Sequence, residues 1–470
     1  MQYIVYDKSS GVILLIKRAG SGKVTQQQAE SMFPDKTVGV WRLGDRMLSV
    51  KNNKIALNDK GEPRGIIICE GMQDYNIEDF DNKSVNSKKI IYKGVFYDHG
   101  GYANMNREIV FRLAQMEDLD VKVEIVPSGK QIDNLTFEKL HYLSRKAIPK
   151  SNSINIIGFT PMQTDVSNFN VFFTMMETET LHPDFARICN SYADAIITPT
   201  HWNKNVFIKG GIKRPIYVVP LGVDIDIYKT GLEKLPITCR ELPSGKKVNR
   251  FPSFNFITLF GWSYRKGIDV IVKAFCDQFT SKDDVGFIIC SRYMGGSDRK
   301  HQRVVERDIL DFMKTYSDPP RVLYYGESTP ISQMPNLMAN GDCFVWGSRG
   351  EGFGLPVCEA GAMEIPVVST YNSSMTDYLT EENSYLTHTD RFITAPNNIA
   401  CISPYYVGQM FPELGRETIK EFGRRMREVY DNYSLAQKKG KLFASQIREK
   451  YNWDVCAENV YNVLHEMKEK

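Results

Sequence analysis

The chain has 470 residues, of which 42% are hydrophobic and 11% aromatic, so it can bury several cores and is not expected to be disordered. Its 59 Lys and Arg residues nearly balance 56 Asp and Glu residues, and this balance gives no argument for a nucleic-acid partner. No run approaches the roughly 18 apolar residues of a membrane span, and the N-terminus lacks the pattern of a signal peptide. The nine cysteines form no CxxC or Cys/His cluster, so we expect buried free thiols and a cytoplasmic protein.

Residues 1–85 have the pattern of a small, mainly-β module. Its short apolar runs, separated by turn residues, cover 3–6, 12–16, 38–43, 47–50 and 66–69. Gly20-Ser-Gly22-Lys23 is not a phosphate loop, because Lys17 stands where the first Gly of that motif belongs and Val24 where Ser or Thr would bind magnesium. The polar stretch 79–89 is expected to be a linker. The sequence leaves the role of this module open.

From Lys88 onward, apolar runs alternate with helical patterns, which is typical of parallel sheets. A first set of strands is expected at 90–96, 121–126, 154–159, 171–175, 195–199 and 216–220. A second set is expected at 256–260, 285–290, 322–325, 344–346 and 367–369. We therefore predict an α/β protein with two Rossmann-like domains, 86–230 and 231–413, and then two helices within 414–470 with Trp453 between them.

One stretch of the second domain carries the strongest chemical signal. An apolar strand at 343–346 is followed by Gly350-Glu351-Gly352-Phe353-Gly354, and a helix is predicted from Leu355, with Pro356 at its first turn. Glycines let backbone N–H groups approach a ligand closely, and the start of a helix attracts anions. The stretch is therefore expected to bind a diphosphate.

A pair of basic residues lies at the turn after the first strand of the second domain. Arg265 offers a planar fork and Lys266 a point charge, and together they can neutralise a diphosphate. A solvated basic pair before a helix is the alternative interpretation. The order and distance of the pair relative to Glu351 favour the binding role.

Glu351 and Glu359, with seven residues between them around Gly-Phe-Gly-Leu-Pro, resemble the signature of the family 4 retaining glycosyltransferases. The Arg265-Lys266-Gly267 element is similar to that family too, and the resemblance covers 88–470. It implies a GT-B fold, in which two domains face a cleft and a C-terminal helix crosses back to the first domain. It also implies that Glu351 binds donor-sugar hydroxyls and that Glu359 binds the ribose.

The same resemblance implies a nucleotide diphosphate sugar as donor, with UDP favoured over GDP, and neither a metal nor another cofactor. The catalytic candidates are Arg265, Lys266, Glu351 and Glu177. The donor-binding candidates are Gly100, Gly101, Gly352, Phe353, Gly354, Leu355 and Glu359. Gly100 and Gly101 belong to a loop that resembles the family's glycine-rich first loop.

The acceptor side departs from the family pattern. Many members carry a His after the fourth strand, whereas this chain has Thr174-Met-Met-Glu177, so Glu177 is the candidate there. His182 stands near a helix start, where a lone His is more often structural, and His99 is similarly ambiguous. Asp224 and Asp226 form a D-x-D pattern, for which a turn-forming role is favoured over metal binding.

Three functions remain open on the sequence. The first is a retaining glycosyltransferase acting on an acceptor hydroxyl of a glycan, a protein or another molecule. The second is a GT-B epimerase or a phosphorylase, although no pyridoxal lysine signature supports the phosphorylase. The third is a non-catalytic sugar-binding or structural protein with a GT-B core. The oligomeric state is open as well.

Overall fold

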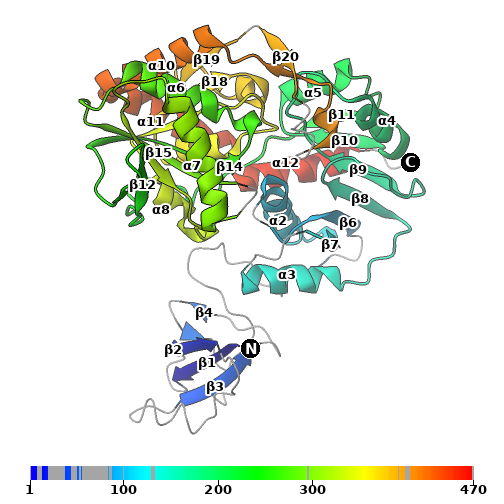
Figure 1. Cartoon of the computed structure of the whole chain (residues 1–470). Coiled ribbons are helices and arrows are strands. Elements are labelled where there is room, and N and C mark those ends of the chain that lie inside the picture. The colour runs from blue at the N-terminus through cyan, green and yellow to red at the C-terminus, as the bar shows by residue number, and fades with distance from the viewer. Residues whose placement is uncertain are drawn as a thin grey trace. The chain divides into compact units, whose positions relative to one another are not determined.

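The computed structural model describes residues 2–7, 13–18, 38–43, 50–51, 54–55, 83, 87–98, 100–128, 133–293, 296–389, 391–396 and 403–467. The chain divides into two compact units, one made of 1–99 and 110–153 and the other of 100–109 and 154–470. Figure 1 labels their helices and strands. The predicted strand at 66–69 and the candidate His99 lie outside the described residues. The domain boundaries predicted from the sequence stay predictions.

The first unit contains two separate sets of strands. The first predicted strands are confirmed, and β1 (Gln2–Asp7) pairs antiparallel with β2 (Ile13–Arg18) and also with β3 (Val38–Leu43). A short antiparallel pair joins β4 (Val50–Lys51) to β5 (Lys54–Ile55). Further along the chain, β6 (Lys88–Val95) pairs in parallel with β7 (Leu119–Val126), against which α3 (Asn134–Ser144) packs.

The second unit begins in α2 (Gly101–Leu113), whose last residues belong to the first unit. It then forms four parallel strands in the order β11-β10-β9-β8. Their bounds are β8 (Ser153–Gly158), β9 (Phe169–Phe173), β10 (Ala195–Thr198) and β11 (Ile216–Val218). Two helices, α4 (Pro183–Tyr192) and α5 (His201–Lys209), bury Phe185 and Phe207 in a core with Phe172 of β9.

A second sheet in this unit has eight strands in the order β13-β12-β16-β15-β14-β17-β18-β19. They are β12 (Cys239–Leu242), β13 (Lys247–Val248), β14 (Phe254–Trp262), β15 (Val285–Tyr293), β16 (Arg321–Tyr325), β17 (Cys343–Trp346), β18 (Val367–Tyr371) and β19 (Tyr385–His388). From β16 to β19 the strands run parallel in the Rossmann order. The predicted strands of both sheets are confirmed to within a few residues.

The strand order locates the ligand-binding edge of this sheet. The chain moves outward from β14 on one side through β15 and β16, and then returns to the other side of β14 with β17. In open parallel sheets ligands bind at such a switch point, outside the carboxyl ends of the strands. The segments that follow β14 and β17 are those that contain Arg265, Lys266 and Glu351.

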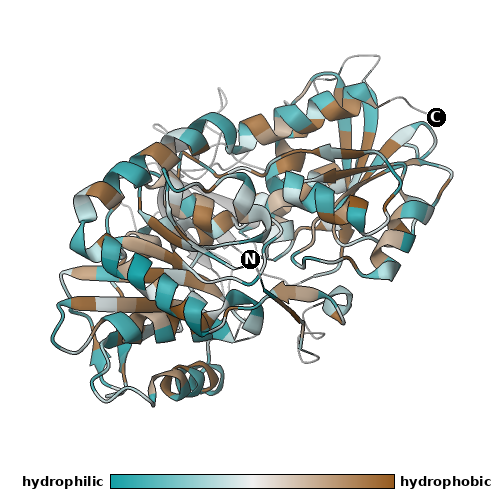
Figure 2. Ribbon diagram, turned by 90° about the horizontal axis from the view of Figure 1, so that it is seen from above, coloured by the Kyte–Doolittle hydropathy of each residue, from teal (hydrophilic) through white to brown (hydrophobic). Residues whose placement is uncertain are grey.

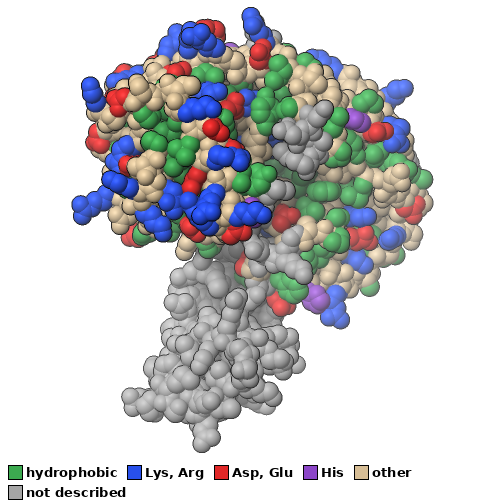
Figure 3. Space-filling view, in the orientation of Figure 1, with side chains coloured by type: hydrophobic (Ala, Val, Ile, Leu, Met, Phe, Trp, Pro, Cys, Tyr) green, Lys and Arg blue, Asp and Glu red, His purple; other side chains and the backbone are tan. Residues whose placement is uncertain are grey.

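Helices cover the second sheet. The strands of the sheet are mostly apolar, whereas the outward faces of the helices are hydrophilic (Figure 2). These are α6 (Ile268–Gln278), α7 (Arg299–Met313), α8 (Met334–Met338), α9 (Leu355–Ala362) and α10 (Arg416–Asp431). On the visible surface, Lys and Arg side chains are interspersed with Asp and Glu (Figure 3). None of the helices in the described part of the chain combines the length and the apolar character needed to cross a membrane.

The C-terminal part departs from the prediction of two helices. Three helices are present, because α10 ends at Asp431 and α11 (Tyr433–Lys450) and α12 (Trp453–Glu466) follow. Trp453 opens α12, where the side chain of Asn452 accepts a hydrogen bond from the Val455 N–H at 2.9 Å. No Gly or Pro marks the break after α10, so the helical pattern in the sequence runs through it. Near α12, the Val223 N–H donates to the Tyr451 carbonyl at 2.8 Å, which ties the end of the chain to the segment after β11.

A segment between β19 and α10 also joins the core of the four-stranded sheet. We call it the hairpin segment (391–396 and 403–412); it contains the antiparallel pair β20 (Phe392–Thr394) and β21 (Met410–Pro412) and the short helix η6 (Pro404–Tyr406). Ala395, Tyr406 and Phe411 are buried together with Phe185 and Phe207. No pattern in the sequence predicted this connection.

Candidate functional site

The site begins with two turns that cross at the edge of the eight-stranded sheet. After β14 the chain forms η2 (Tyr264–Lys266), and Gly267 follows with φ 63°, a left-handed conformation that suits glycine. A Cβ at Gly267 would lie 1.8 Å from the carbonyl oxygen of Gly347, which follows β17. Only glycine therefore lets the two turns approach, and their approach brings Arg265 and Lys266 to the Glu351 loop.

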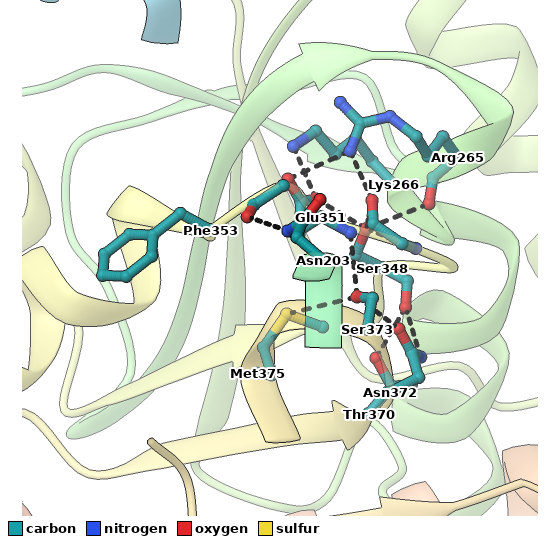
Figure 4. Close-up of polar contacts among 12 residues, drawn as sticks. Asn203, Arg265, Lys266, Ser348, Glu351, Phe353, Thr370, Asn372, Ser373 and Met375 are labelled. Carbon is teal, nitrogen blue, oxygen red and sulfur yellow. Dashed lines mark hydrogen bonds and ion pairs between the residues drawn. The ribbon is translucent and has the colours of Figure 1, made fainter. Parts of the chain in front are cut away.

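Glu351 is the centre of a buried polar cluster (Figure 4). Its Oε1 accepts from Lys266 Nζ at 2.7 Å and from Ser348 Oγ at 2.6 Å, while Oε2 lies 3.0 Å from Arg265 Nη1. The exposed fractions of the side chains are 8% for Glu351, 12% for Arg265 and 14% for Lys266. The sequence-predicted cations and the first glutamate are thus in direct contact.

The charges of this cluster act on one another. Burial by itself raises the pKa of Glu351, but Arg265 and Lys266 outweigh it and lower that pKa to about 2. Burial, together with repulsion from Arg265, lowers the pKa of Lys266 to about 8 although Glu351 opposes the change. The Lys266 ammonium also lies 4.6 Å from the centroid of the Trp346 ring. Lys266 therefore loses its proton more easily than an ordinary lysine, and a bound anion would raise its pKa.

Hydrogen bonds fix the loop that carries Glu351. Ser373 Oγ accepts from the Glu351 N–H at 2.9 Å, and both Thr370 and Asn372 donate to the Ser348 carbonyl, at 2.7 and 3.0 Å. Within the described residues, Arg265 Nε and Ser374 Oγ are buried without a hydrogen-bond partner. The loop that carries Glu351 is therefore held rigidly by these hydrogen bonds.

The neighbouring Arg349 has a supporting position. It forms two hydrogen bonds with the Asp269 carboxylate, at 2.9 and 2.8 Å, and its guanidinium lies 3.9 Å from the centroid of the Tyr264 ring. It thereby ties the loop after β17 to η2 and to the start of α6. Arg349 was not among the sequence candidates, although its place inside the glycine-rich stretch was a signal for it.

The glycines of the loop are required in part by packing. A Cβ at Gly350 would lie 1.8 Å from the Glu177 carbonyl oxygen, and a Cβ at Gly352 would lie 2.5 Å from Met175 Sδ. Gly354 has φ 92° and precedes α9, so it needs the left-handed conformation. The loop therefore packs against the segment that follows β9 in the four-stranded sheet.

Phe353 and Leu355 have different environments. The Phe353 ring points away from Glu351 and packs against Tyr378 and Tyr451, with centroids 5.4 and 6.2 Å apart (Figure 4). Its carbonyl accepts from the Tyr378 hydroxyl at 2.6 Å. Leu355 is half-buried at the first position of α9. The Phe353 ring therefore contributes to the packing of the core, whether or not the residue also contacts a ligand.

Asn203 connects the two sheets beside the cluster. Its Oδ1 accepts from the Met176 N–H at 2.7 Å, and its amide donates to the Gly352 carbonyl at 2.9 Å. Asp377 makes a second connection, because its two carboxylate oxygens accept from the N–H groups of His201 and Trp202 at the start of α5, at 2.6 and 3.1 Å. Neither residue could be assigned from the sequence, since both contacts join distant parts of the chain.

Glu177 lies next to the cluster. It is half-buried, and its carboxyl group interacts electrostatically with Arg265 and Glu351. Burial raises the pKa of Glu177 above its ordinary value despite the opposing effect of Arg265.

His182 caps α4, where its Nδ1 accepts from the Asp184 N–H at 3.2 Å. This contact gives His182 the structural role that the sequence favoured.

The remaining candidates are Glu359 in α9 and the glycines at the start of α2. Glu359, in α9, is half-buried, and burial raises its pKa to about 7. Gly100 and Gly101 are exposed at the start of α2, and a Cβ at Gly101 would meet no atom within 4 Å.

Asp224 Oδ1 accepts from the N–H groups of Asp226 and Ile227, at 3.1 and 3.4 Å, as expected for a turn. Within the described ranges, no group of three or more His, Cys, Asp and Glu side chains could hold a metal ion.

Residues 252–400 match the family model described as Glycosyl transferases group 1. The mannosyltransferase LpsB of lipopolysaccharide core biosynthesis from Rhizobium meliloti (strain 1021) is 30% identical over 171 residues, which cover 35% of this chain and 43% of LpsB. A probable sucrose-phosphate synthase of Thermosipho melanesiensis is 22% identical over 289 residues, 59% of this chain and 56% of that protein. The chain thus spans about half the length of the curated relatives that it matches.

Two solved structures share the fold across most of the chain. HepE from Anabaena, in complex with UDP and glucose, has a TM-score of 0.54 at 14% identity, covering 81% of this chain and all of HepE (100%). The sucrose-phosphate synthase of Thermosynechococcus elongatus has a TM-score of 0.54 at 13% identity, covering 81% of this chain and 98% of that protein. The predicted α/β fold with two Rossmann-like domains and the resemblance to GT-B glycosyltransferases are confirmed. Family 4 membership and retaining stereochemistry stay predictions.

Proposed function

We propose that this protein is a glycosyltransferase that moves a sugar from a nucleotide diphosphate sugar to an acceptor hydroxyl. The observation that carries the proposal is the Arg265–Lys266–Glu351 cluster at the switch point of the eight-stranded sheet, directly before α9. The match of residues 252–400 to group 1 glycosyl transferases supports the same function, since that range contains the cluster.

The two cations supply what the departing diphosphate requires. As the bond between the sugar and the diphosphate lengthens, negative charge grows on the leaving oxygen, and fixed cations stabilise it without rearranging. Arg265 and Lys266 are already oriented by Glu351, at 3.0 and 2.7 Å. The N–H groups at the start of α9 add the positive end of a helix dipole. We assign binding of the diphosphate to these groups.

Glu351 would also accept a hydrogen bond from the donor sugar. A carboxylate has about four acceptor positions, and Lys266, Ser348 and Arg265 already occupy three of them. One position is left for a sugar hydroxyl. Glu351 would therefore orient the cations and contact the sugar at the same time, while Glu359 would accept hydrogen bonds from the ribose.

The proposal also covers the nucleotide, the stereochemistry of transfer and the metal requirement. UDP is favoured as the nucleotide, supported by HepE, which was solved with UDP and glucose. The reaction would retain the anomeric configuration, in line with the resemblance of the Glu351–Glu359 motif to family 4, with the diphosphate assisting deprotonation of the acceptor. No metal would be required, because two cations and a helix start serve the diphosphate. Glu177 would lie on the acceptor side.

A donor screen tests this function. Thermal shifts with UDP-glucose, UDP-N-acetylglucosamine and GDP-mannose identify the donor, and release of UDP or GDP with candidate acceptors then measures transfer. We expect a stabilising shift with a UDP-sugar and release that depends on the acceptor. The absence of any nucleotide binding would support a non-catalytic protein instead, and conversion of the donor into its epimer without an acceptor would support an epimerase.

A further inference from the structure

The first turn of α5 touches two separate parts of the candidate site. Asn203 lies in this turn and is completely buried. Its Nδ2 donates to the Gly352 carbonyl in the Glu351 loop at 2.9 Å, and its Oδ1 accepts from the Met176 N–H, after β9, at 2.7 Å. Figure 4 shows this side chain beside Glu351. One amide group therefore bridges the loop after β17 and the residue that precedes Glu177.

Thr200 fixes the orientation of this amide group. Its Oγ1 accepts from the Asn203 N–H at 3.1 Å, as an N-cap does, and from Asn203 Nδ2 at 2.9 Å. Both hydrogens of Nδ2 are thus used, on Thr200 and on Gly352, and an amide turned the other way would set two donors against each other at Met176. Because these groups are buried, removing the amide leaves the Gly352 carbonyl and the Met176 N–H without these partners.

A second connection joins α5 to the Glu351 loop through the short helix η4 (Ser373–Asp377). At one end of η4, Ser373 Oγ accepts from the Glu351 N–H at 2.9 Å. At the other end, the Asp377 carboxylate accepts from the first two N–H groups of α5, at 2.6 and 3.1 Å. A negative charge is favourable at the start of a helix, so this contact is supported by the dipole of α5.

Ser373 has an unusual backbone conformation at this connection. Its φ is 48°, in the left-handed region that favours glycine, although its side chain is buried. A glycine would fit the backbone better, but it would lack the oxygen that accepts from the Glu351 N–H. Serine thus keeps the contact with the loop at the cost of a less favourable conformation.

The two connections form a closed ring of contacts between the Glu351 loop and α5. The loop cannot move away from the helix unless both hydrogen-bonded connections open together, and such networks carry coupling between sites. Since Oδ1 of Asn203 also holds Met176, a change in the position or order of the loop reaches the segment that contains Glu177. The close approach of Gly350 to the Glu177 carbonyl, where a Cβ would lie 1.8 Å from the oxygen, places the same two segments in direct contact.

We propose that Asn203 is a positioning residue that couples the Glu351 loop to the segment after β9, so that a donor bound at the loop also orders the acceptor side. Transfer needs the two reactants in a fixed relative geometry, and this bridge supplies it from a side chain outside the Glu351–Glu359 motif. The proposal rests on the proposed function, because it needs a nucleotide sugar at the Glu351 loop. It deepens that function by assigning the link between its donor and acceptor sides.

Hydrogen exchange with and without UDP-glucose tests the coupling, because exchange reports local opening of hydrogen-bonded backbone. Peptides that cover 350–356 report on the Glu351 loop, those that cover 174–178 on the segment after β9, and those that cover 199–204 on the start of α5. In the wild type, UDP-glucose should slow exchange in all three.

The variants are Asn203→Ala, Asp377→Ala and the control Asn340→Ala. Asn340 is also a buried amide, and it donates to three backbone carbonyls at 3.1, 3.2 and 3.1 Å. It precedes β17, whereas Glu351 follows that strand, so its loss disturbs the core away from the site. Asp377 is half-buried and opens only the connection through η4.

Asn203→Ala should keep the slowing by UDP-glucose in 350–356 and lose it in 174–178. Asp377→Ala should lose much of the slowing in 199–204, and Asn340→Ala should follow the wild type. Equal slowing of 174–178 in the wild type and Asn203→Ala would overturn the coupling. An absence of slowing in 174–178 of the wild type would overturn it as well, without recourse to any variant.

The rate of UDP release from UDP-glucose gives a readout that a purely structural role would not move. In Asn203→Ala, kcat per folded protein should fall by about 10–100-fold while the Kd for UDP-glucose changes little, since Asn203 orients the loop rather than binding the donor. In Asn340→Ala both quantities should match the wild type. A kcat of Asn203→Ala equal to that of the wild type would contradict the positioning role.

These outcomes are separable from failure of the proposed function. If neither UDP-glucose nor GDP-mannose slows exchange in 350–356 of the wild type, the donor site itself is wrong and the inference falls with it. If UDP-glucose slows exchange in 350–356 of every protein and Asn203→Ala behaves as the wild type in 174–178, only the inference is wrong.

Discussion

The Lys266 ammonium lies 2.7 Å from Oε1 of Glu351, and the two side chains come from turns that follow different strands, β14 and β17. This contact joins the basic pair to the glycine-rich loop before α9. It means that the catalytic candidates share one buried network, so a change in any of them affects the others. The first three predictions below concern this network.

Loss of either cation should reduce turnover more than donor binding. In Arg265→Ala and Lys266→Ala, the charge that grows on the leaving diphosphate is less stabilised, and by analogy with oxyanion donors kcat should fall by about 10²–10³-fold. In Glu359→Ala, the ribose contact is lost equally in ground and transition states, so mainly the donor Kd should rise. The exposed Lys282→Ala is the control. Unchanged kcat in both basic variants would refute the assignment.

The activity should have an alkaline limit set by Lys266. Its pKa of about 8 in the free protein means that the ammonium loses its proton as the pH rises through that value, and donor capture then weakens. We expect kcat/KM for the donor to fall above about pH 8. Lys266→Arg keeps its charge at higher pH, so its profile should extend further into the alkaline range even if its maximum is lower. Identical alkaline limits in both proteins would show that another group is responsible.

Glu351 should stabilise the folded protein in a pH-dependent way. Its pKa of about 2 lies below the ordinary value of a glutamate, about 4.3, so its contribution is complete above about pH 4.3 and is lost as the pH falls toward 2. Urea denaturation of the wild type and Glu351→Gln should therefore show a difference in unfolding free energy on the order of 3 kcal/mol at neutral pH. The difference should shrink at about pH 3. A constant difference over this range would contradict the charged network.

Tyr228 should tune nucleotide binding through Glu359. Burial raises the Glu359 pKa to about 7, and the Tyr228 hydroxyl opposes this by favouring the charged form. UDP-glucose affinity should weaken as the pH falls below about 7, because a protonated carboxyl accepts fewer hydrogen bonds from the ribose. In Tyr228→Phe the weakening should begin at higher pH. Titration calorimetry over this range measures both curves, and equal midpoints would exclude the coupling.

Local patterns predicted most of the fold. Apolar runs such as 285–290 and 344–346 identified the parallel strands because buried strands in such sheets are continuously apolar. Gly267 and Gly354 lie in motifs that the sequence singled out, and the structure gives both a positive φ at the start of a helix. The break between α10 and α11 was missed, since neither Gly nor Pro interrupts the helical pattern there and Asn432 alone marks it.

The contacts that complete the site could not be predicted in the same way. Tyr406 packs with Phe185 and Phe207, and Asp377 caps α5, across more than 150 positions of sequence, so no spacing or periodicity encodes these contacts. Phe353 illustrates the opposite problem: its motif indicates a ligand loop, but its ring is buried against Tyr378 and Tyr451. A motif identifies a loop, whereas the direction of each side chain depends on the surrounding fold.

The most direct test of the central claim is the rate of UDP release from a UDP-sugar, measured with and without EDTA for the wild type, Arg265→Ala and Lys266→Ala. The Glu351 network predicts release by the wild type that persists in EDTA and falls by about 10²–10³-fold in each variant. Complete and reversible loss of release in EDTA would contradict the metal-free site. Equal rates in all three proteins, or no release from any donor, would contradict the claim that this cluster carries glycosyl transfer.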